Sequence, residues 1–129
     1  MDRISAVIIR NKKLLLVTGY NESFYWTPGG KVDSKEKHEQ TLIRELEEEL
    51  SIKPIKISHY STYEAINEIT KKKQKVHCYL IEYKGIPKPQ KEITKILWYS
   101  KQNFKKRIPN ISKGIEDYLI PKLIQDNPI

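Results

Sequence analysis

The chain has 129 residues, a length that suits a single domain with its own core, and it carries 24 Lys and Arg against 16 Asp and Glu, a formal net charge of +8. Its one cysteine excludes an internal disulfide, and the sequence has neither a secretory signal nor the run of roughly 20 apolar residues that a membrane helix needs. We therefore expect one cytoplasmic domain over residues 1–129 with no membrane partner, monomeric or homodimeric, whose basic surplus reflects either a solvated lysine-rich surface or an anionic partner.

The amino-terminal part of the chain predicts two strands and a loop. The apolar runs "ISAVII" and "KLLLVTGY", residues 4–9 and 13–20, flank the polar turn "RNKK". Residues 21–36 form a loop interrupted by the Pro-Gly-Gly run of "TPGG". The glycine pair permits tight backbone conformations, so this loop could direct a carbonyl oxygen at a metal ion.

A helix is predicted over residues 37–50. Ile43, Leu46 and Leu50 recur at helical spacing and are expected to form its buried stripe. Pro54 prevents the helix from running much further.

The second half of the chain predicts three more strands and a closing helix. Ser112 is the expected N-cap of that helix, and Pro121 is expected to break or kink it. The alternation of strands, helix, strands and helix predicts an α/β fold, a mixed sheet with helices packed against it. The expected elements are strands at 55–66 and 75–85 around a lysine-rich turn, a strand within 92–100, and a helix over 111–127.

The predicted helix at 37–50 concentrates acids at its carboxyl end, where the helix dipole disfavours them. Glu45, Glu48 and Glu49 stand at i, i+3 and i+4, so their carboxylates share one helix face, while Glu47 points elsewhere. A divalent hard cation such as Mg²⁺ would relieve the repulsion between them. The alternative is a charged, solvated helix surface, which the helix alone would favour.

Residues 30–52, "GKVDSKEKHEQTLIRELEEELSI", resemble the Nudix box: Gly, five residues, Glu, seven residues, Arg-Glu, an aliphatic, any residue, Glu-Glu, any residue, Gly, an aliphatic. Ser51 stands where the family usually has glycine, and we expect it to alter the helix exit slightly. The resemblance implies the Nudix fold, an α/β/α sandwich around a mixed β-sheet. It also implies hydrolysis of a nucleoside diphosphate linked to another group, with Mg²⁺ or Mn²⁺. The matching positions are Gly30, Glu36, Arg44, Glu45, Leu46, Glu48, Glu49 and Ile52.

The same resemblance assigns roles to individual residues. It implies that Arg44 orients the glutamates and that Glu36 supports the site or a metal-bound water. Glu92, before the strand at "ITKILWYS", matches a late glutamate that reaches the metals or acts as the base in several members. The implied metal ligands are Glu45, Glu48, Glu49 and the carbonyl of Gly29.

The sequence indicates the substrate less clearly than it indicates the family. Tyr25 and Trp26 precede the box and could stack on a base, or pack in the core; for Phe24 we expect the core. The region past the box, "NEIT", carries no marker of a family subclass. By elimination, we expect a nucleoside triphosphate, either standard or damaged.

Two other functions remain open at this stage. One is a nucleotide-binding regulatory domain without activity, although the intact set of Glu45, Glu48 and Glu49 argues against it. The other is a hydrolase of RNA 5′ ends, a cap or a triphosphate. The net charge permits RNA, but the sequence shows no second RNA-binding region, so we do not expect a nucleic-acid partner.

Overall fold

The structure is a computed structural model that describes residues 2–129, and two β-sheets form its centre. The first sheet has the strand order β4-β1-β6-β5, in which only β1 and β6 run parallel. The second is antiparallel, with the order β2-β3-β7. The strands are β1 (Asp2–Val7), β2 (Ile9–Arg10), β3 (Lys13–Gly19), β4 (Gly29–Lys31), β5 (Lys53–Ile66), β6 (Lys73–Lys84) and β7 (Ile93–Tyr99).

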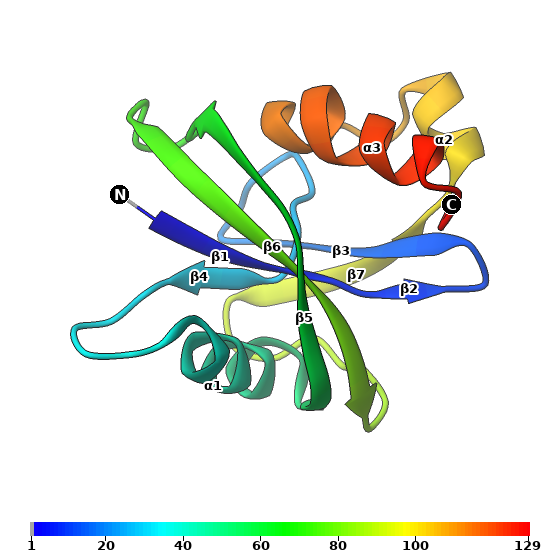
Figure 1. The fold of residues 1–129 in the computed structure, drawn as a ribbon. Coiled ribbons are helices and arrows are strands. Elements are labelled where there is room, and N and C mark those ends of the chain that lie inside the picture. The colour runs from blue at the N-terminus through cyan, green and yellow to red at the C-terminus, as the bar shows by residue number, and fades with distance from the viewer. Residues whose placement is uncertain (1) are drawn as a thin grey trace.

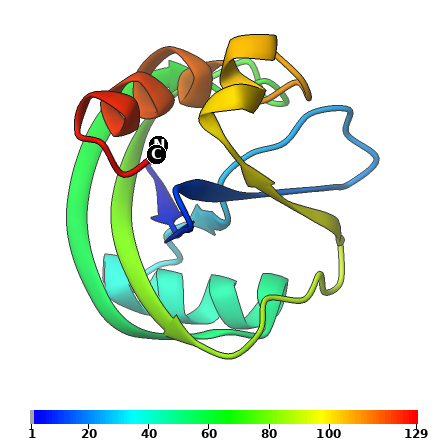
Figure 2. The same ribbon diagram turned by 90° about the vertical axis from the view of Figure 1, so that its right-hand side faces the viewer.

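Helices cover both sides of these sheets. Figure 1 shows α1 on one side, with α2 and α3 on the other. Figure 2 shows β5 and β6 curving from the α1 layer to the α3 layer. The expected α/β/α sandwich around a mixed sheet is therefore confirmed. The helices are α1 (His38–Leu50), α2 (Lys101–Lys106), a π-helical turn η1 (Ile115–Leu119) and α3 (Ile120–Gln125), and none in residues 2–129 is long and apolar enough to cross a membrane.

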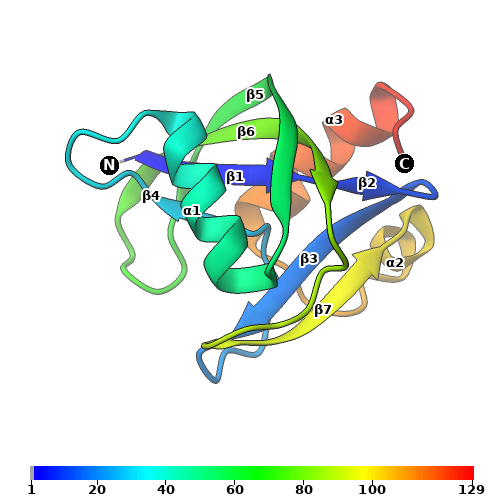
Figure 3. The same ribbon diagram turned by 90° about the horizontal axis from the view of Figure 1, so that it is seen from below.

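Alternation along the central strands divides the core into two apolar layers. On β1, Ile4 and Ala6 pack in the layer beneath α1, whereas Val7 packs in the layer beneath η1 and α3. On β3, Leu15 and Leu16 divide in the same way. Because successive strand residues face opposite sides, each strand supplies both layers. Figure 3 views the molecule from the side that α1 covers.

The buried stripe of α1 differs from the predicted one by one residue. Leu42, Leu46 and Leu50 are fully buried, while Ile43 is 48% exposed. The prediction that Ile43 lies in the stripe was therefore wrong. Positions i, i+4 and i+8 face the sheet, and Ile43 is rotated about 100° from Leu42 around the helix axis. This orientation places Glu45 and Glu49 beside the sheet edge that β4 forms.

Two short elements have no counterpart among the predicted ones. β4 lies inside the segment predicted as loop, and it pairs antiparallel with β1 through Ser5–Gly29 and Arg3–Lys31. It has three residues, two of them glycine, so no strand-like side-chain pattern could reveal it. α2 has the sequence "KQNFKK", too short and too polar to show a helical period.

Ser112 lies at the start of the carboxyl-terminal helix as predicted, and its carbonyl accepts the Glu116 N–H at 3.0 Å. The Ser112 side chain, however, does not cap the helix but donates to the Glu68 carboxylate, at 3.1 Å. Glu68 in turn accepts the Lys113 N–H, at 2.6 Å, so an acid from the β5–β6 loop satisfies this helix end. Pro121 does not break the helix. The π-helical turn η1 directly precedes α3, where the missing proline N–H would interrupt an α-helical ladder.

α1 ends at Ser51 in the left-handed conformation, with φ 56°. The Ser51 N–H donates to the Glu47 carbonyl at 3.1 Å, which satisfies one of the last carbonyls of the helix. The serine therefore takes the left-handed conformation for which glycine is usually selected at a helix end.

Candidate active site

Arg44 connects the loop before α1 to the glutamates on α1. Its Nε and Nη2 donate to the two oxygens of Glu36, at 2.8 and 2.9 Å, as a bidentate pair. Its Nη1 donates to Glu45 Oε1 at 2.8 Å and lies 3.8 Å from Glu48 Oε2. One guanidinium therefore orients two of the three carboxylates that share this helix face.

Glu36 is held in turn by the loop and by α1. Its Oε1 accepts the Asp33 N–H at 2.9 Å and the Thr41 hydroxyl at 3.0 Å. Hydrogen bonds from Arg44, and then from the Asp33 backbone, lower the pKa of Glu36 to about 2. Glu36 is therefore a permanent anion at neutral pH that fixes Arg44 in place.

Burial raises the pKa values of two glutamates of α1, Glu45 and Glu49. Desolvation raises the pKa of Glu49 to about 7, although Glu49 Oε1 accepts the Gly29 N–H at 3.0 Å. Desolvation also raises the pKa of Glu45, against the opposing effect of Arg44. The charge of Glu48 raises the pKa values of both Glu45 and Glu49, and the charge of Glu45 also raises that of Glu49. A nearby cation would reverse both shifts, because opposite charge favours the ionised form.

Glycine is required at two positions where β4 passes between β1 and α1. Gly29 has φ +141°, and a Cβ atom there would lie 2.0 Å from the Ile4 carbonyl oxygen. A Cβ atom at Gly30 would lie 2.6 Å from the Glu45 carboxylate. The two glycines therefore allow the backbone of β4 to lie directly against the acidic face of α1.

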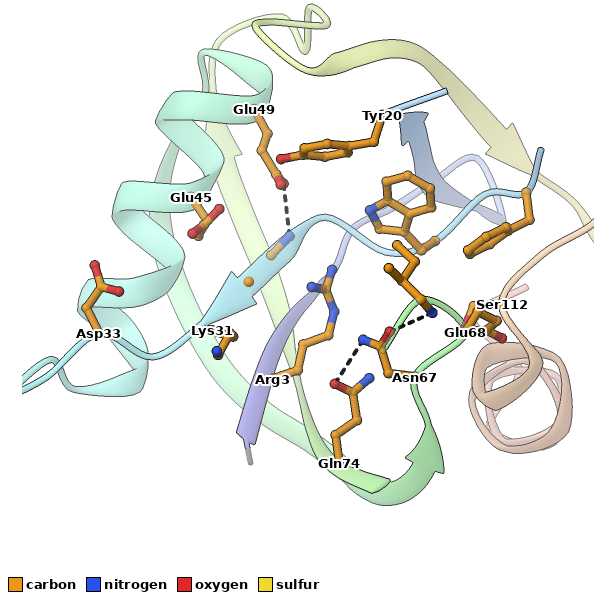
Figure 4. A pocket seen from close by; sticks show the side chains of 15 residues that line it. Arg3, Tyr20, Lys31, Asp33, Glu45, Glu49, Asn67, Glu68, Gln74 and Ser112 are labelled. Atoms are coloured by element: carbon orange, nitrogen blue, oxygen red, sulfur yellow. Dashed lines mark hydrogen bonds between the residues drawn. The ribbon is translucent and has the colours of Figure 1, made fainter. Parts of the chain in front are cut away.

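A cavity of about 420 Å³ opens beside these carboxylates. Figure 4 shows Glu45 and Glu49 toward one end and Asn67 and Gln74 toward the other, with Arg3 between them. The Arg3 guanidinium donates to the Thr27 carbonyl at 2.8 Å, and its charge lowers the pKa values of both glutamates. The lining residues are Arg3, Tyr20, Phe24, Trp26, Gly29, Gly30, Lys31, Asp33, Glu45, Glu49, Asn67, Glu68, Ile69, Gln74 and Ser112.

Of the two aromatic residues predicted to contact the substrate, Trp26 lines the cavity and Tyr25 does not. The backbone of Trp26 is fixed by hydrogen bonds in both directions with Val17. Phe24 and Tyr20 also line the cavity, with ring centroids 5.4 and 6.4 Å from that of Trp26. Tyr25 instead packs against the core layer beneath α3 and lies outside the lining, so the structure gives no support for its assignment as a substrate contact. Phe24, which we expected in the core, lines the cavity instead.

Glu92 lies at the entrance to β7, exposed and outside the cavity lining. Its backbone carbonyl accepts the Tyr20 N–H at 3.1 Å, which ties the two segments together. Burial raises the pKa of Tyr20, and the charges of Glu92, Glu49 and Glu45 raise it further. The fold therefore brings Glu92 to the same neighbourhood as the α1 carboxylates, through Tyr20 rather than by direct contact.

Sequence reasoning missed the cavity wall opposite α1. Asn67 is held in place by accepting the Ile69 and Thr70 N–H groups, at 2.8 and 2.9 Å, and it donates to Gln74 at 3.3 Å. The only available signal was "NEIT" after β5, in which an Asn can form an Asx turn. Arg3 carried no local signal, because its role depends on the pairing of β1 with β4.

The chain also matches a known family model, the NUDIX domain, over residues 1–119. No curated protein sequence shows significant similarity to it.

Several solved structures share its fold. The MutT protein from Methanosarcina mazei Go1 has a TM-score of 0.80 at 19% identity, covering 98% of this chain and 95% of that one. The E. coli ORF135 protein has a TM-score of 0.77 at 21% identity, covering 98% and 92%. The NUDIX domain of Shewanella oneidensis NrtR, complexed with ADP ribose, has a TM-score of 0.72 at 20% identity, covering 98% and 87%.

The Glu36–Arg44 pair predicts an acid-sensitive part of the stability of the metal-free protein. Since the folded-state pKa of Glu36 is lowered to about 2 from 4.5, its contribution is present above about pH 4.5 and is lost as the pH falls towards 2. The melting temperature of wild type should exceed that of Glu36→Gln most at neutral pH, and the gap should shrink below pH 4.5. Glu39→Gln, which removes an exposed charge in the first turn of the same helix, is the matched control. A gap that stays constant down to pH 2 would contradict the pairing.

Proposed function

We propose a substrate and a metal site for this chain, which belongs to the Nudix family of pyrophosphohydrolases. Enzymes of this family act on nucleoside diphosphate derivatives and use divalent metal ions. We infer that this member hydrolyses a phosphoanhydride bond of a nucleoside triphosphate, standard or damaged, with Mg²⁺ or Mn²⁺ bound at α1. The observation that carries the proposal is the acidic face of α1 at one end of a cavity of nucleotide size.

The residues present suit a hard divalent cation. Glu45, Glu48 and Glu49 offer carboxylate oxygens on one face, and hard cations prefer oxygen ligands. The raised pKa values of Glu45 and Glu49 fit a site completed by positive charge. The Gly29 N–H points to Glu49, and since successive peptide groups of a strand face opposite sides, we expect the Gly29 carbonyl to face α1 as well. We therefore assign these four residues as ligands.

A divalent ion held by Glu45, Glu48, Glu49 and the Gly29 carbonyl would supply charge neutralisation for the phosphates and a lower pKa for a water molecule. Arg44 holds Glu45 and Glu48 in position, and Glu36 holds Arg44, so both act through the ligands. Glu92 accepts the proton of the attacking water, as the general base. The support for this role is the backbone hydrogen bond between Glu92 and Tyr20, a residue that lines the cavity.

The rest of the cavity suits the nucleoside and the phosphates. Trp26, with Phe24 beside it, offers an aromatic surface for a base. The Asn67 oxygen already accepts two backbone N–H groups, so Asn67 can donate to a base edge through its NH₂ group, whereas Gln74 can both donate and accept. Arg3 lies between these groups and the carboxylates, where it can contact the phosphates. We therefore place the base at the amide end and the phosphates at the acidic end.

ADP-ribose is the second candidate ligand. One structural neighbour, the NUDIX domain of NrtR, is complexed with ADP ribose. ADP-ribose also presents a base and a pyrophosphate, so the same cavity could take it. Activity on ADP-ribose would make this chain a different kind of hydrolase, and binding without turnover would make it a regulatory domain.

A substrate panel with Mg²⁺ tests the proposal. We expect nucleoside triphosphates to be cleaved with release of pyrophosphate, and ADP-ribose and 5′-triphosphorylated RNA to be cleaved at least tenfold more slowly in kcat/KM. Chromatography of the products and a pyrophosphate assay provide the measurement. Preferential cleavage of ADP-ribose or RNA would overturn the substrate assignment, and absence of any turnover would favour the regulatory alternative.

Two neighbouring glutamates of α1 provide the matched variants for that panel. Glu48→Gln keeps the size of a proposed ligand and removes its charge, so kcat should fall by about 10²-fold or more. Glu47→Gln removes an exposed charge from the adjacent position and should stay within about twofold of wild type. Equal effects of the two substitutions would show that Glu48 acts only as surface charge.

Glu92 and Trp26 should separate kinetically. If Glu92 is the base, Glu92→Gln should lower kcat at least tenfold, leave KM within a few-fold and change the acidic limb of the pH–rate profile. If Trp26 binds the base, Trp26→Leu should raise KM several-fold with a smaller effect on kcat. Wild-type kcat and an unchanged profile in Glu92→Gln would leave water activation to the metal and the α1 glutamates.

A further inference from the structure

All three histidines of the chain gather at one place, where α1 begins, although they are far apart in the sequence. His38 is the first residue of α1, His59 lies on β5 and His77 on β6. Asp2, the first described residue of β1, lies beside them. The cluster is at the opposite end of α1 from Glu48 and Glu49. Since His77 pairs with Ile4, it lies on the face of the sheet that α1 covers, the face that Figure 3 views.

Strand register explains why the cluster forms. β1 and β6 run parallel, with Asp2 opposite Lys75 and Ile4 opposite His77. Asp2 and His77 are each an even number of residues from Ile4 and Ile81, which pack in the layer beneath α1. Their side chains therefore face the same side, toward the amino end of the helix. His38, at the amino end of α1, packs against these residues, with its ring centroid 4.7 Å from that of His77.

Three of these groups have the geometry of metal ligands. Asp2, His38 and His77 each offer one ligand atom, and these three atoms lie within 4.8 Å of one another. His77 Nε2 and Asp2 Oδ2 are 3.1 Å apart. Two ligands of a tetrahedral Zn²⁺ at its usual bond lengths are about 3.3 Å apart. That pair therefore already has the required spacing, and His38 needs only a small side-chain adjustment.

The second nitrogen of each imidazole is held by a hydroxyl. His38 Nδ1 lies 2.6 Å from the Tyr79 hydroxyl, and His77 Nδ1 lies 3.3 Å from the Thr62 hydroxyl. Metal-bound histidines almost always have such a partner on the other nitrogen, because it fixes the tautomer and the ring orientation. These contacts leave His77 Nε2 directed at Asp2, as a ligand atom should be.

The environment of His38 favours the neutral imidazole that a metal ion binds. Burial, and then the charge of His77, lower the pKa of His38, so its imidazole is neutral at neutral pH. Metal ions bind the lone pair of the neutral ring, so a neutral His38 does not have to lose the extra proton of the imidazolium before it binds a metal. Burial therefore opposes protonation of His38 but not its coordination to a metal.

We propose that Asp2, His38 and His77 form a binding site for a first-row transition-metal ion of the Zn²⁺ type, separate from the carboxylate face of α1. Two imidazoles and one carboxylate suit Zn²⁺ and similar ions, whereas Mg²⁺ prefers an all-oxygen set. Three protein ligands leave a fourth tetrahedral position for water. The bound ion ties β1, α1 and β6 together at the start of the helix that carries Arg44.

A simple hydrogen-bonded pair is the competing explanation. The Asp2–His77 contact lowers the pKa of Asp2 and could exist for its own sake. That pair does not include His38, whose Nδ1 lies 2.6 Å from the Tyr79 hydroxyl. The two separate contacts do not require the ligand atoms of Asp2, His38 and His77 to lie within 4.8 Å of one another, whereas a shared metal ion would.

Calorimetric titration of Zn²⁺ into the untagged protein tests the site. Saturating Mg²⁺ is present throughout, so that the carboxylate face of α1 is occupied. We expect one Zn²⁺ per chain with micromolar or tighter affinity, reduced at least tenfold by His38→Gln and by His77→Gln. His59→Gln, which replaces the exposed third histidine of the cluster, is the matched control and should change the affinity by less than threefold. Zn²⁺ should raise the melting temperature of wild type and of this control, but not that of the two ligand variants.

Asp2→Asn gives a ligand variant at the exposed start of the chain, where loss of the fold is not a concern, and it should also weaken Zn²⁺ binding at least tenfold. Co²⁺ should give the visible absorption bands of a tetrahedral site in wild type, and these bands should be lost in the ligand variants. No Zn²⁺ binding by wild type would overturn the proposal. So would undiminished affinity in His38→Gln, His77→Gln and Asp2→Asn, or an equal loss in His59→Gln. None of these outcomes depends on hydrolytic activity, so the site stands or falls separately from the proposed function.

Discussion

The bidentate pair between Arg44 and Glu36 is the interaction on which the candidate active site depends. It joins the loop before α1 to the middle of the helix, and the remaining guanidinium donor is directed at Glu45. A planar fork can serve both acids at once, and a lysine ammonium could not reproduce that geometry. Because Glu36 stays ionised, Arg44 stays fixed, and two carboxylates that would otherwise repel each other keep a defined direction. The positive charge and the hydrogen bonds of Arg44 thus reduce the repulsion among the acids at the carboxyl end of α1.

The second constraint is the close approach of the β4 backbone to the acidic face of α1. The stripe of Leu42, Leu46 and Leu50 fixes the rotation of α1 on the sheet, so the acidic face lies beside β4. The glycines of β4 then let its backbone come against that face, and the Gly29 N–H meets Glu49. The same strand β1 that pairs with β4 carries Arg3 into the cavity and Asp2 into the histidine cluster. One short region of sheet therefore positions residues at both sites.

Much of the candidate active site could be predicted because its acidic residues are close together in the sequence. Glu45, Glu48, Glu49 and Arg44 lie within one helical turn and a half, and the spacing in "RELEEE" determines their shared face. The rotation of that helix was harder to predict, since Leu42 and Ile43 are both apolar and only packing distinguishes them. β4 was missed because its strand identity comes from pairing with β1, not from its side chains. The far wall of the cavity, with Arg3, Asn67 and Gln74, and the histidine cluster depend on long-range register that a single sequence does not show.

The central claim is that the carboxylates of α1, arranged through Arg44, bind a divalent cation. The most direct measurement is a Mn²⁺ titration followed by electron paramagnetic resonance, on untagged wild type and on the double variant Glu45→Gln, Glu49→Gln. Glutamine keeps the shape of both side chains and removes their charges. The variant should remain folded, because the free-energy cost of burying two charged carboxylates is also removed. We predict saturable Mn²⁺ binding in wild type and a loss of at least tenfold in affinity in the variant. Equal Mn²⁺ affinity in the two proteins would contradict the account.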